Sequence, residues 1–170
     1  MTIEGAIRTA IEFEMRVRDT YAAASAGDEA GDRFLQVLAA EEQRHVDYLE
    51  SRLAEWVETG RVTVATLATA VPARARLTQA ARELKERIRM PAHQLDVSLE
   101  TLKRALDVEL KTSAFYRELV DTLPEGEPRR MFARVLEIED GHVAIVSAEL
   151  DSVRGLGYWF DMREFDLEAG

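Results

Sequence analysis

Two pairs of a glutamate and a histidine, each spaced three residues apart, constrain this chain more than any other feature. Glu42 precedes His45 and Glu139 precedes His142, each inside a stretch whose apolar residues recur every three or four positions. That period indicates an amphipathic helix, and the spacing of three places both members of a pair on one helix face. Because the neighbours on that face are apolar, we expect both pairs to point into a helical core.

The apolar periodicity predicts four long helices. The first covers residues 3–25, the second runs from the break at Gly27 to Gly60, the third covers about 95–122, and the fourth begins at Pro128. The expected core positions, helix by helix, are Ile3, Ile7, Ala10, Val17 and Tyr21; Phe34, Leu35, Leu38, Leu49, Leu53 and Trp56; Leu99, Leu102, Leu106, Ser113, Tyr116 and Val120; and Phe132, Val135, Val146 and Leu150.

The stretch between the second and third helices is too long for a simple turn. Residues 60–91 hold a Thr-rich apolar segment and then a short charged helical segment from Pro72 to about Arg89. A crossover of this length lets the helices on either side of it run parallel, which short loops do not allow. The sequence therefore predicts an all-α four-helix bundle over residues 1–154. The tail, 155–170, is rich in aromatic residues, which we expect to cap the bundle or a subunit contact, or alternatively to dock a partner.

The two halves of the chain repeat one pattern. Glu14 has Tyr21 seven residues after it, and Glu109 has Tyr116 seven residues after it; each of these pairs precedes one Glu-x-x-His pair. The chain thus looks like a duplicated helical hairpin. Pseudo-twofold symmetry would bring four glutamates and two histidines around one point, namely Glu14, Glu42, His45, Glu109, Glu139 and His142.

Such a cluster needs positive charge. Burying several carboxylates together costs several kcal/mol per ion, because desolvation and mutual repulsion both oppose ionisation. Two divalent cations would balance four carboxylates, and neutral histidines would supply one nitrogen each. Ligands that are mostly oxygen suit two iron ions, or manganese or a mixed iron and manganese pair, whereas zinc would bind without redox chemistry. The alternative is a metal-free bundle in which these side chains are exposed or hydrogen-bonded.

Composition excludes several other classes of function. The formal charge is −10, and no Lys/Arg cluster stands clear of acidic residues, so we expect no nucleic acid partner. There is no cysteine, which excludes disulfides, thiolate metal sites and cysteine nucleophiles. No apolar run approaches the roughly 18 residues of a membrane span, and no signal peptide is recognisable. We therefore expect a cytoplasmic protein.

The chain resembles the ferritin-like di-iron proteins, and among them the rubrerythrin-like ones. The resemblance is carried by the two Glu-x-x-His pairs, the two Glu and Tyr pairs and the crossover, over residues 3–152. It implies that Glu42 and Glu139 bridge or chelate, that Glu14 and Glu109 cap the two metals, and that each histidine binds one metal. It also implies a homodimer that reduces hydrogen peroxide or dioxygen with iron.

Two departures from that family shape the expected function. Rubrerythrins proper carry a rubredoxin domain with four cysteines, so this cysteine-free chain needs an external electron-donor protein. Thr112 stands where a further carboxylate is common, which moves the site toward a simpler six-ligand centre. We expect a di-iron oxidoreductase that reduces peroxide or dioxygen. A ferroxidase that handles iron as substrate is the alternative, and a non-catalytic interaction bundle is a third reading.

Other residues near the motifs have more than one reading. Tyr21 and Tyr116 are candidates for catalytic proton or electron transfer, but aromatic core packing explains them equally well. Glu12, Glu41 and Asp140 neighbour the candidate ligands in sequence but point elsewhere on their helices. We expect these three to be solvated or to contact the ligands from outside.

Overall fold

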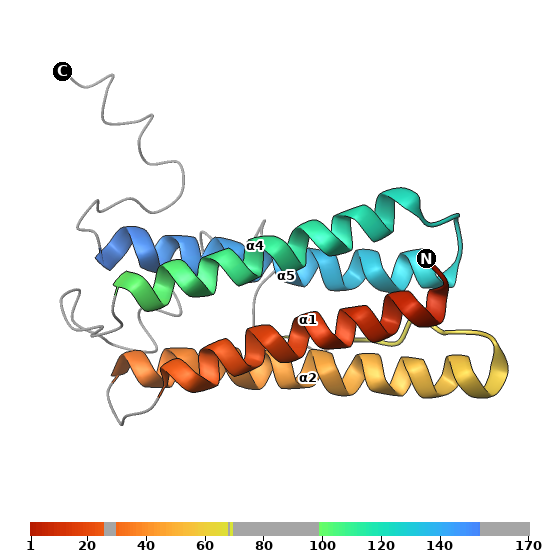
Figure 1. The fold of residues 1–170 in the computed structure, drawn as a ribbon, viewed down its shortest axis with the longest axis horizontal. Coiled ribbons are helices and arrows are strands. Elements are labelled where there is room, and N and C mark those ends of the chain that lie inside the picture. Colours follow the sequence, from red (N-terminus) through yellow and green to blue (C-terminus); the bar gives the residue numbers. More distant parts are fainter. Residues whose placement is uncertain (26–29, 68, 70–98, 154–170) are drawn as a thin grey trace, which may run out of the picture.

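The computed structural model describes residues 1–25, 30–67, 69 and 99–153. These residues form four helices, α1 (Ile3–Ala24), α2 (Ala30–Thr59), α4 (Leu99–Thr122) and α5 (Glu127–Val153), and no strand. The helices pack as a four-helix bundle (Figure 1), so the predicted all-α fold class is confirmed. None of the described helices is apolar over a length that would cross a membrane.

Local sequence explains where the helices begin and end. At the start of α1, Thr2 is the N-cap, and its side-chain oxygen accepts a hydrogen bond from the Gly5 N–H at 3.1 Å. At the end of α2, Gly60 has a φ of +67° and donates its N–H to the Trp56 carbonyl at 2.8 Å. Only glycine takes that left-handed conformation without strain, so Gly60 ends the helix as expected. Pro128 occupies the second position of α5, where its missing N–H costs nothing.

The helix directions follow from the packing. α1 and α2 form one antiparallel hairpin, and α4 and α5 form the other (Figure 1). α1 also packs antiparallel to α4, since Tyr21 reaches Glu109 while Tyr116 reaches Glu14. Consequently α2 and α4 run parallel, with the end of α2 and the start of α4 at opposite ends of the bundle. This is the arrangement for which a crossover was predicted.

The first part of the crossover packs on the bundle. Val62 and Leu67 are buried, and the Val64 N–H donates to a Glu127 carboxylate oxygen at 3.3 Å, close to the start of α5. Arg52 donates to the Thr63 carbonyl at 3.2 Å, which holds the segment against α2. The charged helical segment expected from Pro72 and the aromatic tail at 155–170 lie outside the described residues.

The apolar core is divided into two clusters. One is built around Ile7, Leu49, Phe132 and Val135, and the other around Val17, Leu38, Leu102, Val146 and Leu150. Between them lies a layer of buried polar residues contributed by all four helices. The core therefore encloses a polar centre rather than excluding one.

Most predicted core positions are buried, while Ile3, Phe34, Leu53, Trp56 and Leu99 are partly buried at the margins of the clusters, and α4 shows a local shift. On α4 the fully buried apolar residues are Leu102, Ala105 and Leu119, whereas Leu106 and Val120 are only partly buried. The two partly buried residues pack at the margin of the clusters. The buried face of α4 includes Leu102, Ser113 and Tyr116 as expected, but Ala105 is buried in place of Leu106 and Leu119 in place of Val120.

Candidate metal centre

All six side chains that the sequence pattern singled out meet at the middle of the bundle. Each has no exposed surface, and they come from all four helices: Glu14 from α1, Glu42 and His45 from α2, Glu109 from α4, and Glu139 and His142 from α5. Each lies on the inward face of its helix, flanked in the helical period by apolar core residues.

The two Glu-x-x-His pairs form the centre of the cluster. One ligand atom from each of Glu42, His45, Glu139 and His142 can be chosen so that all four lie within 4.8 Å of one another. The pairs also reach across to each other: His45 Nδ1 lies 3.0 Å from a Glu139 oxygen, and His142 Nδ1 lies 2.7 Å from a Glu42 oxygen. The imidazole rings are stacked, with centroids 5.2 Å apart. The four side chains thus surround one small volume.

Glu14 and Glu109, the two glutamates of the cluster that belong to no Glu-x-x-His pair, flank this centre, one on each side. A Glu14 oxygen lies 3.3 Å from His45 Nδ1, and a Glu109 oxygen lies 3.9 Å from His142 Nδ1. Each histidine therefore has its own additional carboxylate from the first helix of a hairpin. The pseudo-twofold relation expected from the repeat is present in the positions of these side chains.

The two tyrosines connect the halves of the bundle. Tyr21 on α1 donates its hydroxyl hydrogen to Glu109 on α4, and Tyr116 on α4 donates to Glu14 on α1. Both rings are fully buried. Each tyrosine thus packs in the core and also hydrogen-bonds a carboxylate of the opposite hairpin, while proton or electron transfer by these residues stays a prediction.

Many buried polar atoms of the cluster have no hydrogen-bond partner within the described part of the chain. They are both carboxylate oxygens of Glu42 and of Glu139, one oxygen of Glu109, both ring nitrogens of His142 and Nε2 of His45. The 2.7 Å approach between Glu42 and His142 is within ion-pair distance but does not have hydrogen-bond geometry. Unsatisfied buried groups are costly, and atoms that converge on a common point are what a metal ion would satisfy.

The electrostatics of the cluster show the same excess of negative charge. Burial, with repulsion from Glu14, raises the pKa of Glu42 to about 8 against the opposing effect of His45. Burial and the charges of Glu14 and Glu42 likewise raise the pKa of Glu139 to about 7. Burial and Glu42 raise the pKa of Glu109 well above its usual value. Without a cation, the protein compensates by retaining protons.

Glu14 and His45 form a hydrogen-bonded contact within the cluster, with 3.3 Å between His45 Nδ1 and a Glu14 oxygen. Burial opposes ionisation of Glu14, but hydrogen bonding to His45 and the charge of His45 outweigh it and lower the pKa of Glu14. Burial likewise disfavours the charged imidazole of His45, yet Glu42, Glu139 and Glu14 together raise its pKa well above the usual value. In the metal-free cluster His45 therefore acts as the cation that a metal ion would replace.

Side chains just outside the cluster fix the helices at this level. Asp140 accepts hydrogen bonds from Ser113 at 2.6 Å and from Arg117 at 2.8 Å, which joins α5 to α4. In the other hairpin Arg18 donates to Gln43 at 2.8 Å, which joins α1 to α2. Gln43 and Asp140 each follow the glutamate of a Glu-x-x-His pair. The repeat therefore includes a polar link beside the site, and the sequence pattern alone did not reveal it.

Three further residues refine the sequence-based expectations. Glu41 is not solvated: its side chain is fully buried and forms an ion pair with Arg44. Glu12 is exposed, as one of the two expectations had it. Thr112 is buried and donates its hydroxyl hydrogen to the Val108 carbonyl at 2.9 Å, so it satisfies its own helix and offers no carboxylate to the site.

Comparisons with protein-family models, with curated proteins and with solved structures return no match. The site is a buried Glu and His group, enclosed by a four-helix bundle, whose ligand atoms converge closely enough to hold metal ions.

Proposed function

We propose that the cluster binds two divalent metal ions, preferably iron, and that the protein is related to the rubrerythrin-like di-iron proteins. The observation that carries this proposal is the set of fully buried carboxylate oxygens and imidazole nitrogens of Glu42, Glu139 and His142 that have no hydrogen-bond partner in the described chain. Two divalent cations balance the four carboxylates and neutral histidines supply nitrogen ligands, a donor set that suits iron or manganese.

The contacts support a division of labour among the six residues. Glu42 and Glu139 approach the histidine of the other hairpin as well as their own, which supports a role for both in holding the two ions. Glu14 and His45 would then complete one ion's ligands. Glu109 with His142 would complete the other's, because these two lie on the opposite side.

We further propose that the bound ions reduce hydrogen peroxide or dioxygen. Iron supplies reversible one-electron chemistry when bound, and reduction of one peroxide to two waters consumes two electrons and two protons. The chain's own contribution is positional: the apolar clusters exclude water, and Tyr21 and Tyr116 hold the outer carboxylates in place. Because no cysteine is present, an external donor must return the electrons.

Metal content and turnover test this function together. Protein produced with supplemental iron should contain about two metal ions per chain and consume many equivalents of peroxide when a reductant is supplied. Glu139→Ala and His142→Ala should lose both properties. Glu137→Ala is the matched control, because Glu137 is exposed on the same helix. A metal content well below one ion per chain would refute the proposal.

A ferroxidase is the second candidate, and Thr112 is the residue that favours it. Its hydroxyl is engaged with the α4 backbone, so the site lacks the additional carboxylate that the resemblance associates with efficient peroxide reduction. The two activities differ in what they consume. A peroxidase keeps its iron over many turnovers, whereas a ferroxidase oxidises added ferrous iron stoichiometrically and passes it on.

A further inference from the structure

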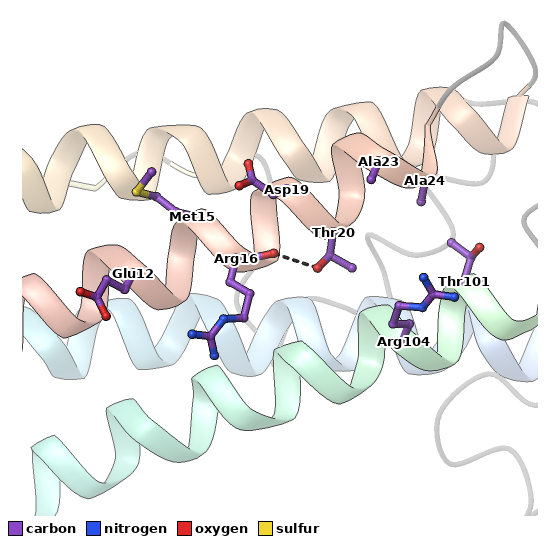
Figure 2. A pocket seen from close by; sticks show the side chains of 9 residues that line it. All are labelled: Glu12, Met15, Arg16, Asp19, Thr20, Ala23, Ala24, Thr101 and Arg104. Carbon is purple, nitrogen blue, oxygen red and sulfur yellow. Dashed lines mark hydrogen bonds between the residues drawn. The ribbon is translucent and has the colours of Figure 1, made fainter.

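A groove on the outer surface, between α1 and α4, has the features of a docking site. Its volume is about 730 Å³. Figure 2 shows Arg16 extending from α1 toward α4, and Arg104 on α4 at the same groove. Met15 is 39% exposed at its edge and adds an apolar contact surface. The lining residues are Glu12, Met15, Arg16, Asp19, Thr20, Ala23, Ala24, Thr101 and Arg104.

Neither arginine forms an ion pair with a described residue. The Arg16 guanidinium lies over the Phe13 ring, 5.3 Å from its centroid. Arg104 makes no hydrogen bond or ion pair with the described residues, but its charge, after that of Lys103, contributes to the lowered pKa of the neighbouring Glu100.

Glu12 in the groove and Glu100 beside Arg104 offset part of this charge. Asp19 is neutralised by Arg18, whose Nη2 lies 2.7 Å from its carboxylate. The groove is therefore locally positive on a protein whose formal charge is −10. Arginines placed in this way suit carboxylates of a binding partner.

The groove lies directly outside one end of the candidate metal centre. Thr20 lines the groove and precedes Tyr21, whose buried ring points inward and whose hydroxyl donates to Glu109. One helix, roughly 10 Å thick with its side chains, thus separates a partner in the groove from a proposed metal ligand. The chain has no cysteine, so under the proposed function the electrons come from an external donor.

We propose that this groove is the docking site of the electron donor, and that the donor is a small acidic redox protein whose surface carboxylates pair with Arg16 and Arg104. The inference rests on the proposed function, because it assigns a donor to that metal centre. Two one-electron transfers through the groove balance the reduction of one peroxide to two waters with two protons. Charge complementarity selects an acidic partner over a neutral or basic one.

Charge reversal tests the docking site, with an acidic [2Fe–2S] ferredoxin as the probe. The variant is Arg16→Glu/Arg104→Glu, and the matched controls are Arg8→Glu on α1 and Lys111→Glu on α4, which lie outside the groove. Calorimetry measures ferredoxin binding to the zinc-loaded, redox-inert protein. Stopped-flow spectroscopy measures reduction of the iron-loaded protein by reduced ferredoxin and, separately, by uncharged hydroquinone.

Wild type and both controls should bind ferredoxin, more weakly as salt increases, and the double variant should lose about tenfold or more in affinity and in reduction rate. Its reduction by hydroquinone should be unchanged, which shows that its metal centre is intact. Equal binding and equal ferredoxin rates in wild type and the double variant, or no binding to wild type, would overturn the docking site. If neither ferredoxin nor hydroquinone reduces the iron-loaded wild type, the proposed redox function fails. The calorimetry on the zinc-loaded protein is independent of that result, and it decides whether the groove docks an acidic partner.

Discussion

Replacing Glu42 by glutamine should stabilise the metal-free protein at alkaline pH, although it removes a residue from the centre of the core. In the folded chain the pKa of Glu42 is raised to about 8 and that of Glu139 to about 7, against an ordinary value of 4.5. The folded state therefore holds protons that the unfolded state has released. Stability is then undiminished below about pH 4.5, falls as the pH rises, and levels off above the folded pKa values.

The size of this effect follows from the displacement of the pKa values. One pKa unit corresponds to about 1.4 kcal/mol, so ionising Glu42 costs the folded state about 5 kcal/mol by pH 8, and Glu139 about 3 kcal/mol. His45 acts in the same direction, because its raised pKa is a stabilising contribution that is lost as the pH rises through it. Glu14 has a lowered pKa, so its contribution is lost only in acid, outside this range. Domains of this kind have a total stability of only about 5–15 kcal/mol.

Urea unfolding followed by circular dichroism at pH 5 to 8, after removal of metal with a chelator, measures the effect. Wild type should lose several kcal/mol across this range. Glu42→Gln should lose less and be the more stable protein at pH 8, because the amide keeps the shape of the side chain and carries no charge. Glu50→Gln, at an exposed position on the same helix, should follow wild type.

Adding zinc should reverse the order. Metal binding requires deprotonated ligands, so it should stabilise wild type most at pH 8 and stabilise Glu42→Gln little. The reasoning would be refuted if metal-free wild type were equally stable at pH 5 and pH 8, or if Glu42→Gln were the less stable protein at pH 8.

Three further outcomes are expected. Tyr116→Phe should weaken metal affinity, measured by metal titration, roughly tenfold, because it removes the hydrogen bond that holds Glu14. Tyr48→Phe is the control and should leave this affinity unchanged, because it removes only a long 3.4 Å hydrogen bond to a backbone carbonyl. Gly60→Ala should lower the free energy of unfolding by about 1 kcal/mol because of its positive φ, and Gly126→Ala, which meets nothing closer than 3.7 Å, should cost less in the same denaturation assay. Chelation should lower the Tm of iron-loaded wild type at pH 8, and an unchanged Tm would argue against a structural contribution of the metal.

The helices and the six converging side chains could be predicted because both depend on the helical repeat of residues along the sequence. A helix turns about 100° per residue, so a spacing of three or seven fixes which side chains share a face. The apolar stripes then show which face is buried. The shifted stripe of α4 shows the limit of this reasoning. Ala105 is buried in place of Leu106 because the rotation of a helix is set by its neighbours, not by the size of one side chain.

Contacts between helices could not be predicted from the helical repeat of the sequence alone. The links from Asp140 to Ser113 and from Arg18 to Gln43 join residues on different helices, and nothing in the local sequence specifies such partners. Glu41 is similar: of its two expected settings, solvated or in contact with the ligands from outside, the first is wrong, because Glu41 is fully buried beside Arg44. Its burial depends on what packs over α2.

The sequence by itself determined that four amphipathic helices carry a duplicated set of glutamates, histidines and tyrosines on their buried faces. Only the tertiary structure decided that the duplicates meet crosswise, with Tyr21 on Glu109, Tyr116 on Glu14, and each histidine beside the Glu-x-x-His glutamate of the other hairpin. The physical reason is that helix faces are encoded locally, every few residues, whereas the pairing of faces depends on the packing of the whole core. The candidate metal centre exists only where that packing brings the two halves together.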